Sequence, residues 1–189
     1  MNTDSSQIKT PTPESFTLNH DANGLTISYR WFSPSYIFLA FFCLFWDGFL
    51  VFWYSVAFAQ DAPWLMFVFP LLHLGVGIGL TYTALAGFYN STSVTAGQGT
   101  LSVRHGPLPW PGSRTMPATE IIQLYAEQRM VQSRNGAHPR YQLSAITRDN
   151  RKIRLIAGID EPDNVRFLER KIEEYLGIQN RPVEGEMSG

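Results

Sequence analysis

Two apolar stretches decide the fold: residues 36–59 read YIFLAFFCLFWDGFLVFWYSVAFA, and residues 64–88 read WLMFVFPLLHLGVGIGLTYTALAGF. The hydrocarbon core of a bilayer is about 30 Å thick, and a helix needs about 20 consecutive apolar residues to cross it. Both stretches meet this length, and only residues 60–63 separate them. We therefore predict a membrane α-helical hairpin over residues 34–89, with two transmembrane helices at 36–59 and 64–88.

The distribution of basic residues predicts how this hairpin is oriented. The connection 60–63 has no Lys or Arg, whereas Arg30 precedes the first apolar stretch and Arg104 and Arg114 follow the second. Cytoplasmic flanks of membrane helices are enriched in Lys and Arg. We expect a multi-pass protein of the inner cell membrane with both termini in the cytoplasm.

The flanking segments are polar and divide into a tail, a ribbon and one domain. Residues 1–14 are rich in Ser, Thr and Pro and predict a disordered tail, as do residues 179–189 at the other end. Residues 15–33 contain two short strands around the polar turn 19–24, so they predict a β ribbon. Residues 90–178 remain for a cytoplasmic domain.

This domain alternates strand patterns with turn residues and ends in a helix. Five strands are expected, at residues 91–96, 100–105, 120–131, 141–148 and 152–157. A closing helix is predicted at residues 162–176, because Pro162 and Asp163 suit its first turn and Gly177 suits the position after its end. Val165, Leu168, Ile172, Tyr175 and Leu176 form its apolar stripe.

This order of elements predicts the fold class of the domain and its link to the hairpin. Antiparallel strands capped by one C-terminal helix form an α+β layout, a small PH-like β barrel or sheet. We expect the ribbon 15–33 to pair with this domain, so that the hairpin is inserted between two strands of one sheet.

Several segments resemble a family of uncharacterised bacterial two-helix integral membrane proteins with a PH-like cytoplasmic β domain. The resemblance covers roughly residues 16–178 and is carried by LTISYRWF at 25–32, Trp46-Asp47, His73, NST at 90–92, RHGPLPW at 104–110, and Leu168-Glu169 to Gly177-Ile178. Some members carry an N-terminal zinc ribbon, which this chain lacks, since Cys43 is its one cysteine. The resemblance implies no activity.

Asp47 and His73 are the ionisable residues near the middle of the two apolar stretches. Asp47 lies 12 residues before Ala59, and His73 lies 10 residues after Pro63, so their depths differ by about 3 Å. We therefore predict an intramembrane polar pair. It either fixes the register of the two helices or serves as a proton relay, a pH-sensitive hinge or half of a metal site completed by a second subunit.

Small residues recur every four positions in the second apolar stretch, at Gly75, Gly79, Thr83 and Gly87. Such a stripe lets another helix approach closely. It predicts either an oligomer face or a face that packs against the first helix of the same hairpin.

The loop at residues 106–112 contains three prolines and Trp110. We interpret Trp110 as an anchor at the membrane interface, and a polyproline ligand for a partner domain is the alternative.

Basic residues gather in the later strands. Seven basic residues and one acid lie between residues 129 and 154, and eight acids and four bases follow residue 157. Arg148, Arg151, Lys152 and Arg154 are candidates for binding anionic lipid headgroups, and a solvated face is the alternative. A nucleic-acid partner is not expected, because the basic strands lack a run of stacking aromatics.

No catalytic motif, metal site or cofactor site is predicted. His20, His105 and His138 are isolated in the sequence, and no HExxH, GxSxG or phosphate loop is present. We predict a non-enzymatic membrane protein that anchors a scaffold or sensor domain. Its expected partners are the bilayer, anionic headgroups, a second copy or an unidentified protein. The alternative is an oligomeric proton or metal-ion transporter or channel subunit that uses Asp47 and His73.

Overall fold

The computed structural model describes residues 13–22, 24–133, 136–179, 183 and 187. The chain forms two compact units. The hairpin unit comprises Arg30–Ser91 and Gly106–Leu108, and the β unit comprises Met1–Tyr29, Thr92–His105 and Pro109–Gly189. The predicted tail 1–14 falls outside the described residues apart from 13 and 14, and the predicted tail 179–189 is described at 179, 183 and 187 only.

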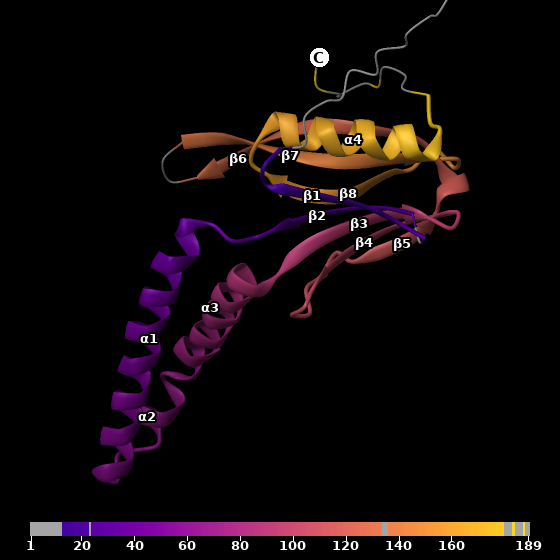
Figure 1. Ribbon diagram of the computed structural model, residues 1–189. Helices are drawn as coiled ribbons and strands as arrows, with labels where there is room; N and C mark the ends of the chain where they lie inside the picture. The colour runs from indigo at the N-terminus through magenta and orange to yellow at the C-terminus, as the bar shows by residue number, and fades with distance from the viewer. Residues whose placement is uncertain (1–12, 23, 134–135, 180–182, 184–186, 188–189) are drawn as a thin grey trace, which may run out of the picture. The chain divides into compact units, whose positions relative to one another are not determined.

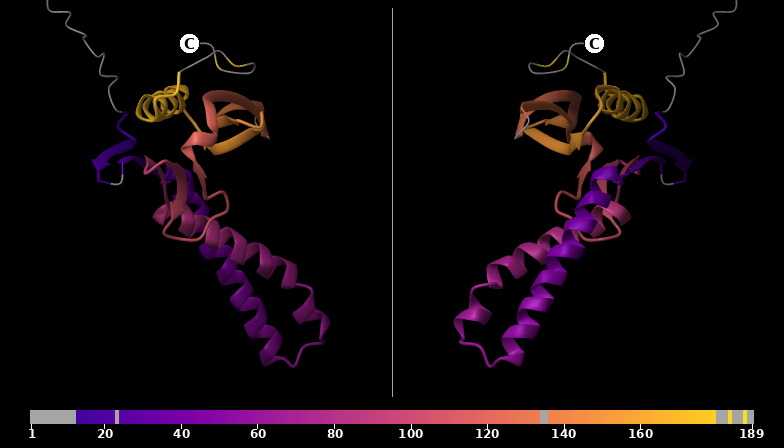
Figure 2. Two further views of the ribbon diagram at one scale, coloured as in Figure 1. Left: turned by 90° about the vertical axis from the view of Figure 1, so that its right-hand side faces the viewer. Right: turned by 90° about the vertical axis from the view of Figure 1, so that its left-hand side faces the viewer.

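The hairpin unit consists of α1 (Pro34–Ala59), α2 (Leu65–Val68) and α3 (Leu71–Tyr89), and α1 and α3 run side by side (Figures 1 and 2). The spans Pro34–Ala59 and Leu65–Tyr89 are each long and apolar enough to cross a membrane. This finding supports membrane association of the chain.

The second predicted helix, 64–88, is interrupted between α2 and α3, which corrects the prediction of one continuous helix. Pro70 stands at the interruption and precedes Leu71, the first residue of α3. Proline has no backbone N–H, and its ring collides with the carbonyl four residues earlier. The carbonyl of Met66 therefore loses its normal helical donor.

The first sheet of the β unit has five strands in the order β1-β2-β3-β4-β5. They are β1 (Phe16–Asp21), β2 (Gly24–Arg30), β3 (Ser91–Gly97), β4 (Thr100–Gly106) and β5 (Arg114–Pro117). Because β2 and β3 are neighbours, the predicted insertion of the hairpin between two strands of one sheet is confirmed.

Two turns of this sheet differ in how well they were predicted. β1 and β2 pair up to Asp21 opposite Gly24, so the turn is shorter than the predicted 19–24; its Asn23 lies outside the described residues. The predicted β3–β4 hairpin turns at Gln98 and Gly99, which both have positive φ, 49° and 73°. Two such residues are typical of the two-residue turn that matches strand twist.

The second sheet has the order β6-β7-β8 and is antiparallel throughout. Its strands are β6 (Ile121–Ser133), β7 (Gly136–Thr147) and β8 (Lys152–Ile159), and a short 3-10 helix, Ala118–Glu120, precedes β6. The closing helix α4 (Pro162–Leu176) has the predicted bounds and packs on this sheet (Figure 1). Gly177 ends α4 with φ of 67°, as its left-handed C-terminal position requires.

Neither sheet closes on itself within the described residues, so a complete barrel is not observed. The edge of β6 shows why. The Glu169 carboxylate accepts a hydrogen bond from the N–H of Ala126 at 3.1 Å, and Glu173 accepts from the N–H of Leu124 at 3.4 Å. These two backbone donors are thereby bonded to α4 instead of to another strand.

One apolar core holds the β unit together. Val165, Leu168 and Ile172 of the predicted stripe are buried in it, together with side chains from both sheets. Tyr175 was predicted to join them but is 42% exposed. Glu169 and Glu173 are buried on the same helix, which the apolar pattern did not indicate.

Candidate functional site

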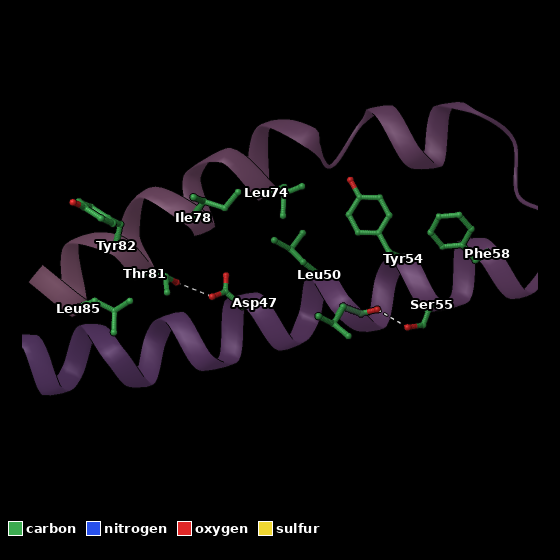
Figure 3. A pocket seen from close by; sticks show the side chains of 11 residues that line it. Asp47, Leu50, Tyr54, Ser55, Phe58, Leu74, Ile78, Thr81, Tyr82 and Leu85 are labelled. Atoms are coloured by element: carbon green, nitrogen blue, oxygen red, sulfur yellow. Dashed lines mark hydrogen bonds between the residues drawn. The ribbon is translucent and has the colours of Figure 1, made fainter. Parts of the chain in front are cut away.

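Asp47 of α1 is bonded to Thr81 of α3. The Thr81 hydroxyl donates to Oδ2 of Asp47 at 2.7 Å, as Figure 3 shows. Gly77 of α3 is buried beside this carboxylate, and a Cβ at position 77 would lie 2.7 Å from Asp47 Oδ1. The absence of a side chain at Gly77 therefore makes room for the carboxylate between the helices.

The predicted contact between Asp47 and His73 is not made, and this corrects the prediction. The His73 ring stacks on Trp46 with 5.7 Å between the ring centroids, and it lies 5.7 Å from the ring of Phe69. Its Nδ1 is buried and has no hydrogen-bond partner within the described residues. Asp47 and His73 are thus separate polar points in the hairpin.

The direction in which helical side chains lean explains this outcome. Each Cα–Cβ bond of a helix tilts towards the N-terminus of that helix. α1 and α3 run in opposite directions (Figure 1). By this geometry the side chain of Asp47 tilts towards the open end of the hairpin and that of His73 tilts towards α2. Thr81 lies nearer the open end and leans back towards Asp47. Similar depth alone is insufficient for a contact.

Side chains of α1 bond the carbonyls left at the break before α3. The indole N–H of Trp53 donates to the Met66 carbonyl at 3.0 Å, and the Tyr54 hydroxyl donates to the Phe67 carbonyl at 3.1 Å. In a bilayer no water is present to bond such carbonyls, so they need a protein donor. The break at Pro70 is therefore compatible with a hydrocarbon environment.

A groove of about 640 Å³ lies between α1 and α3 (Figure 3). Its size falls within the range of small-molecule sites, roughly 300–1,000 Å³. Asp47 and Thr81 face it among mostly apolar neighbours. The lining residues are Asp47, Leu50, Val51, Tyr54, Ser55, Phe58, Leu74, Ile78, Thr81, Tyr82 and Leu85. The groove is thus an apolar site with a carboxylate in one wall.

The predicted small-residue stripe does not keep to one face. A Cβ at Gly75 or Gly79 would meet nothing within 4 Å, whereas a Cβ at Gly87 would lie 2.2 Å from the ring of Tyr36 on α1. Four residues turn a helix by 400°, so each step drifts by about 40° and the stripe winds around the helix. Thr83 donates to the Gly79 carbonyl of its own helix. Gly87 therefore packs within the hairpin, and Gly75 and Gly79 face outwards.

The basic candidates are all exposed; Arg148 and Arg151 lie in the turn between β7 and β8, and Lys152 and Arg154 lie on β8. Arg151 pairs with Asp149 at 2.8 Å, and the Lys152 ammonium lies 5.8 Å from the ring centroid of Tyr125. Arg148 and Arg154 have no side-chain partner within the described residues. These two arginines are the ones best placed to take an external anion.

His105 of β4 belongs to a polar group that the sequence did not indicate. Its Nδ1 lies 2.9 Å from the Thr92 hydroxyl, and its backbone N–H donates to the Ser113 hydroxyl at 3.0 Å. Burial lowers the pKa of His105, so the neutral imidazole is favoured in the folded protein. Burial also raises the pKa of Tyr29, against the effect of its hydrogen bond with Thr92.

The Pro-rich loop is bound to the end of α3 by one buried side chain. The Asn90 amide donates to the Leu108 carbonyl at 3.0 Å, and its oxygen accepts from the Leu108 N–H at 2.7 Å. The Asn90 carbonyl also accepts from the N–H of Trp31 at 3.1 Å. Trp110, the predicted interface anchor, is half-buried two residues after Leu108.

The described residues contain no group of three or more His, Cys, Asp or Glu side chains arranged to hold a metal ion. No protein-family model matches the sequence, and no curated protein matches it either. The resemblance to bacterial two-helix membrane proteins therefore stays a prediction.

The sequence identified the polar residue Asp47 but not its hydrogen-bond partner Thr81, and it did not identify the donors to the carbonyls at the break before α3. Pro70 was a readable signal, because proline inside an apolar helix exposes a carbonyl and so requires a donor nearby. Trp53 and Tyr54 on the first apolar stretch carry side-chain donors that could have been matched to the carbonyls near Pro70. Thr81 gave no signal, since an isolated Thr in a membrane helix commonly bonds its own backbone.

Proposed function

We propose that this chain is a non-enzymatic integral membrane protein that holds a PH-like scaffold or sensor domain at the cytoplasmic face of the inner membrane. The two apolar spans would cross the bilayer, with both termini in the cytoplasm. The β unit would then meet lipids or proteins near the membrane surface.

The observation that carries this proposal is the insertion of the hairpin between β2 and β3. Arg30 ends β2 only four positions before α1 begins, and Asn90 alone separates α3 from β3. The Trp31–Asn90 and Asn90–Leu108 hydrogen bonds continue the strand contacts into the base of the hairpin. The chain therefore enters and leaves the hairpin through two neighbouring strands of the β unit, as expected for an anchored domain.

Arg148 and Arg154 support anionic headgroups as a ligand of the domain. Each basic residue close to an anionic surface contributes about 1 kcal/mol. Ligand binding to the folded state raises thermal stability. Phosphatidylglycerol should therefore raise the melting temperature of the detergent-solubilised full chain above that in phosphatidylcholine, and the double change Arg148→Gln/Arg154→Gln should remove the difference. If the double variant kept the same difference in melting temperature between the two lipids, these arginines would not be the headgroup-binding residues.

The Asp47–Thr81 bond favours one competing function, an oligomeric proton or ion transporter. Intramembrane carboxylates commonly mark proton and ion pathways. Reconstitution of the full chain into liposomes that contain a pH-sensitive dye separates the two functions. An anchor gives the proton leak of empty liposomes with either wild type or Asp47→Asn. A flux that appears with wild type and disappears with Asp47→Asn would replace the anchor proposal by a transporter.

A further inference from the structure

We propose that the groove between α1 and α3 is a binding site for a lipophilic organic cation, an ammonium or phosphonium centre carried on apolar groups. The proposal concerns the hairpin unit alone and goes beyond the anchoring function. It rests on the shape of the groove, its lining and its charge.

The lining suits a ligand that is apolar apart from one positive centre. Leu50, Leu74 and Ile78 form apolar walls, and Asp47 is the lining residue with a carboxylate. The hydroxyls of two other lining residues already donate to backbone carbonyls. Tyr54 donates to the Phe67 carbonyl, and Ser55 donates to the Val51 carbonyl (Figure 3). Asp47 is therefore the carboxylate that the lining offers to a ligand, with its Oδ2 already accepting from Thr81.

Aromatic rings in the same groove favour a cation. Tyr54, Phe58 and Tyr82 all line it. A cation near the face of an aromatic ring is stabilised by the negative charge of that face, most strongly in desolvated sites. These rings lie along the groove on both sides of Asp47, so a ligand whose positive centre meets the carboxylate would place its apolar groups against them (Figure 3).

The chain itself does not supply this cation. No Lys or Arg occurs between residues 31 and 103. His73 is the remaining basic side chain in the two spans, and its ring packs against Trp46 and Phe69. A charged group inside a bilayer is costly unless it is paired. An external cation in the groove would therefore lower the cost of the Asp47 carboxylate.

The same distribution of charge decides against a second copy of the hairpin as the occupant. A second hairpin would bring apolar side chains but no Lys or Arg at this depth. An acyl chain of a lipid would fill the walls and leave the carboxylate uncompensated, because lipid headgroups stay at the membrane surface. A small lipophilic cation would both pack against the apolar walls and pair with the Asp47 carboxylate.

Tetraphenylphosphonium tests this site, with tetraphenylborate as an anion of matched size and shape. Binding is measured by equilibrium dialysis of the full chain in an uncharged maltoside detergent. We expect saturable binding of tetraphenylphosphonium to wild type and no saturable binding of tetraphenylborate. Asp47→Asn should weaken cation binding at least about tenfold, a loss of about 1.4 kcal/mol or more.

Two further variants keep the test decisive if Asp47→Asn fails to fold. Ile78→Trp fills the groove and keeps the carboxylate, whereas Leu72→Trp places the same ring on an exposed position of α3 outside the lining. We expect binding to be lost in Ile78→Trp and kept in Leu72→Trp. Equal binding by these two variants, equal binding of the two probes, or no saturable cation binding to wild type would overturn the proposal.

Discussion

In the hairpin and at the edge of β6, some backbone groups lack the hydrogen-bond partner that a regular helix or sheet would provide. Side-chain donors replace the missing partner in the hairpin, and side-chain acceptors replace it at the edge of β6. In the hairpin, Pro70 exposes acceptors, and the indole of Trp53 and the hydroxyl of Tyr54 donate to them. At the edge of β6 the exposed groups are donors, and the carboxylates of Glu169 and Glu173 accept from them. An indole or a phenol supplies a hydrogen-bond donor, whereas a carboxylate supplies acceptors. The kind of backbone group left without a partner therefore determines which side chains bond to it in each unit.

The largest expected effect is at the β6 edge. Glu173→Ala removes the acceptor of the Leu124 N–H and of the Gln123 side-chain amide, both of which are buried. A hydrogen bond to a charged group contributes about 1.5–3 kcal/mol, and two such bonds are lost, so we expect the free energy of unfolding to fall by at least about 1.5–3 kcal/mol. Denaturant unfolding monitored by near-UV circular dichroism measures it.

Glu174→Ala is the matched control for this change. Glu174 is the next residue on α4, and its exposed carboxylate pairs with Lys171 at 2.7 Å. Exposed pairs of this kind contribute about 0–1 kcal/mol. If both alanine variants lost the same stability, Glu173 would have no special role at the strand edge.

The next effect concerns the break at Pro70 in the second apolar span. Trp53→Phe leaves the Met66 carbonyl without its donor and should cost about 1 kcal/mol. Pro70→Ala restores the backbone N–H that normally bonds this carbonyl. We therefore expect Trp53→Phe to cost much less in a Pro70→Ala background. Reversible unfolding in mixed micelles measures this double-mutant cycle, and additive losses would refute the link between Trp53 and Pro70.

A smaller loss is expected from the bond between the helices. Thr81→Val removes the hydroxyl that donates a hydrogen bond to Asp47. Interhelical hydrogen bonds in membranes contribute about 0.6 kcal/mol on average, so we expect a loss of stability of this size. Thr83→Val is the control, because the Thr83 hydroxyl bonds its own helix at the Gly79 carbonyl. The melting temperature of the detergent-solubilised chain should fall more for Thr81→Val. A larger fall for Thr83→Val would contradict the assignment.

The smallest effect is a pH dependence at His105. Its pKa lies below the ordinary value of 6.5 because of burial, so the unfolded state binds more protons between these two values. The stability from neutral His105 is complete above about pH 6.5 and falls as the pH drops towards the folded pKa. His105→Gln should flatten the decrease in melting temperature between pH 7.5 and 5.5. If the melting temperature of His105→Gln fell with pH as steeply as that of wild type, other titratable groups would be responsible for the decrease.

The order of elements was more predictable from the sequence than their contacts. Helix α4 matches its predicted bounds because Pro162 and Gly177 define its ends through local backbone preferences. The strand β5 was missed because it follows a loop with three prolines and is only four residues long. Local patterns give little information on such a short edge strand.

The sequence predicted that Asp47 is a polar residue between the two helices, but the predicted pairing of Asp47 with His73 was wrong. Residue counting placed Asp47 and His73 at similar depths, but depth does not include the tilt of side chains towards their helix N-termini. The role of Gly77 was not predicted either, because the four-residue repeat that contains Gly75 and Gly79 does not include it. Which glycine faces the partner helix depends on the rotation of α3, which depends in turn on tertiary packing.

The pairing of Asp47 with Thr81 is the central structural claim, and cysteine crosslinking tests it most directly. In a Cys43→Ser background, the pairs Asp47→Cys/Thr81→Cys and Asp47→Cys/His73→Cys are oxidised in membranes with copper phenanthroline. We expect rapid disulfide formation for the first pair and little for the second. Efficient crosslinking of positions 47 and 73 with none between 47 and 81 would contradict the account and restore the pairing predicted from depth alone.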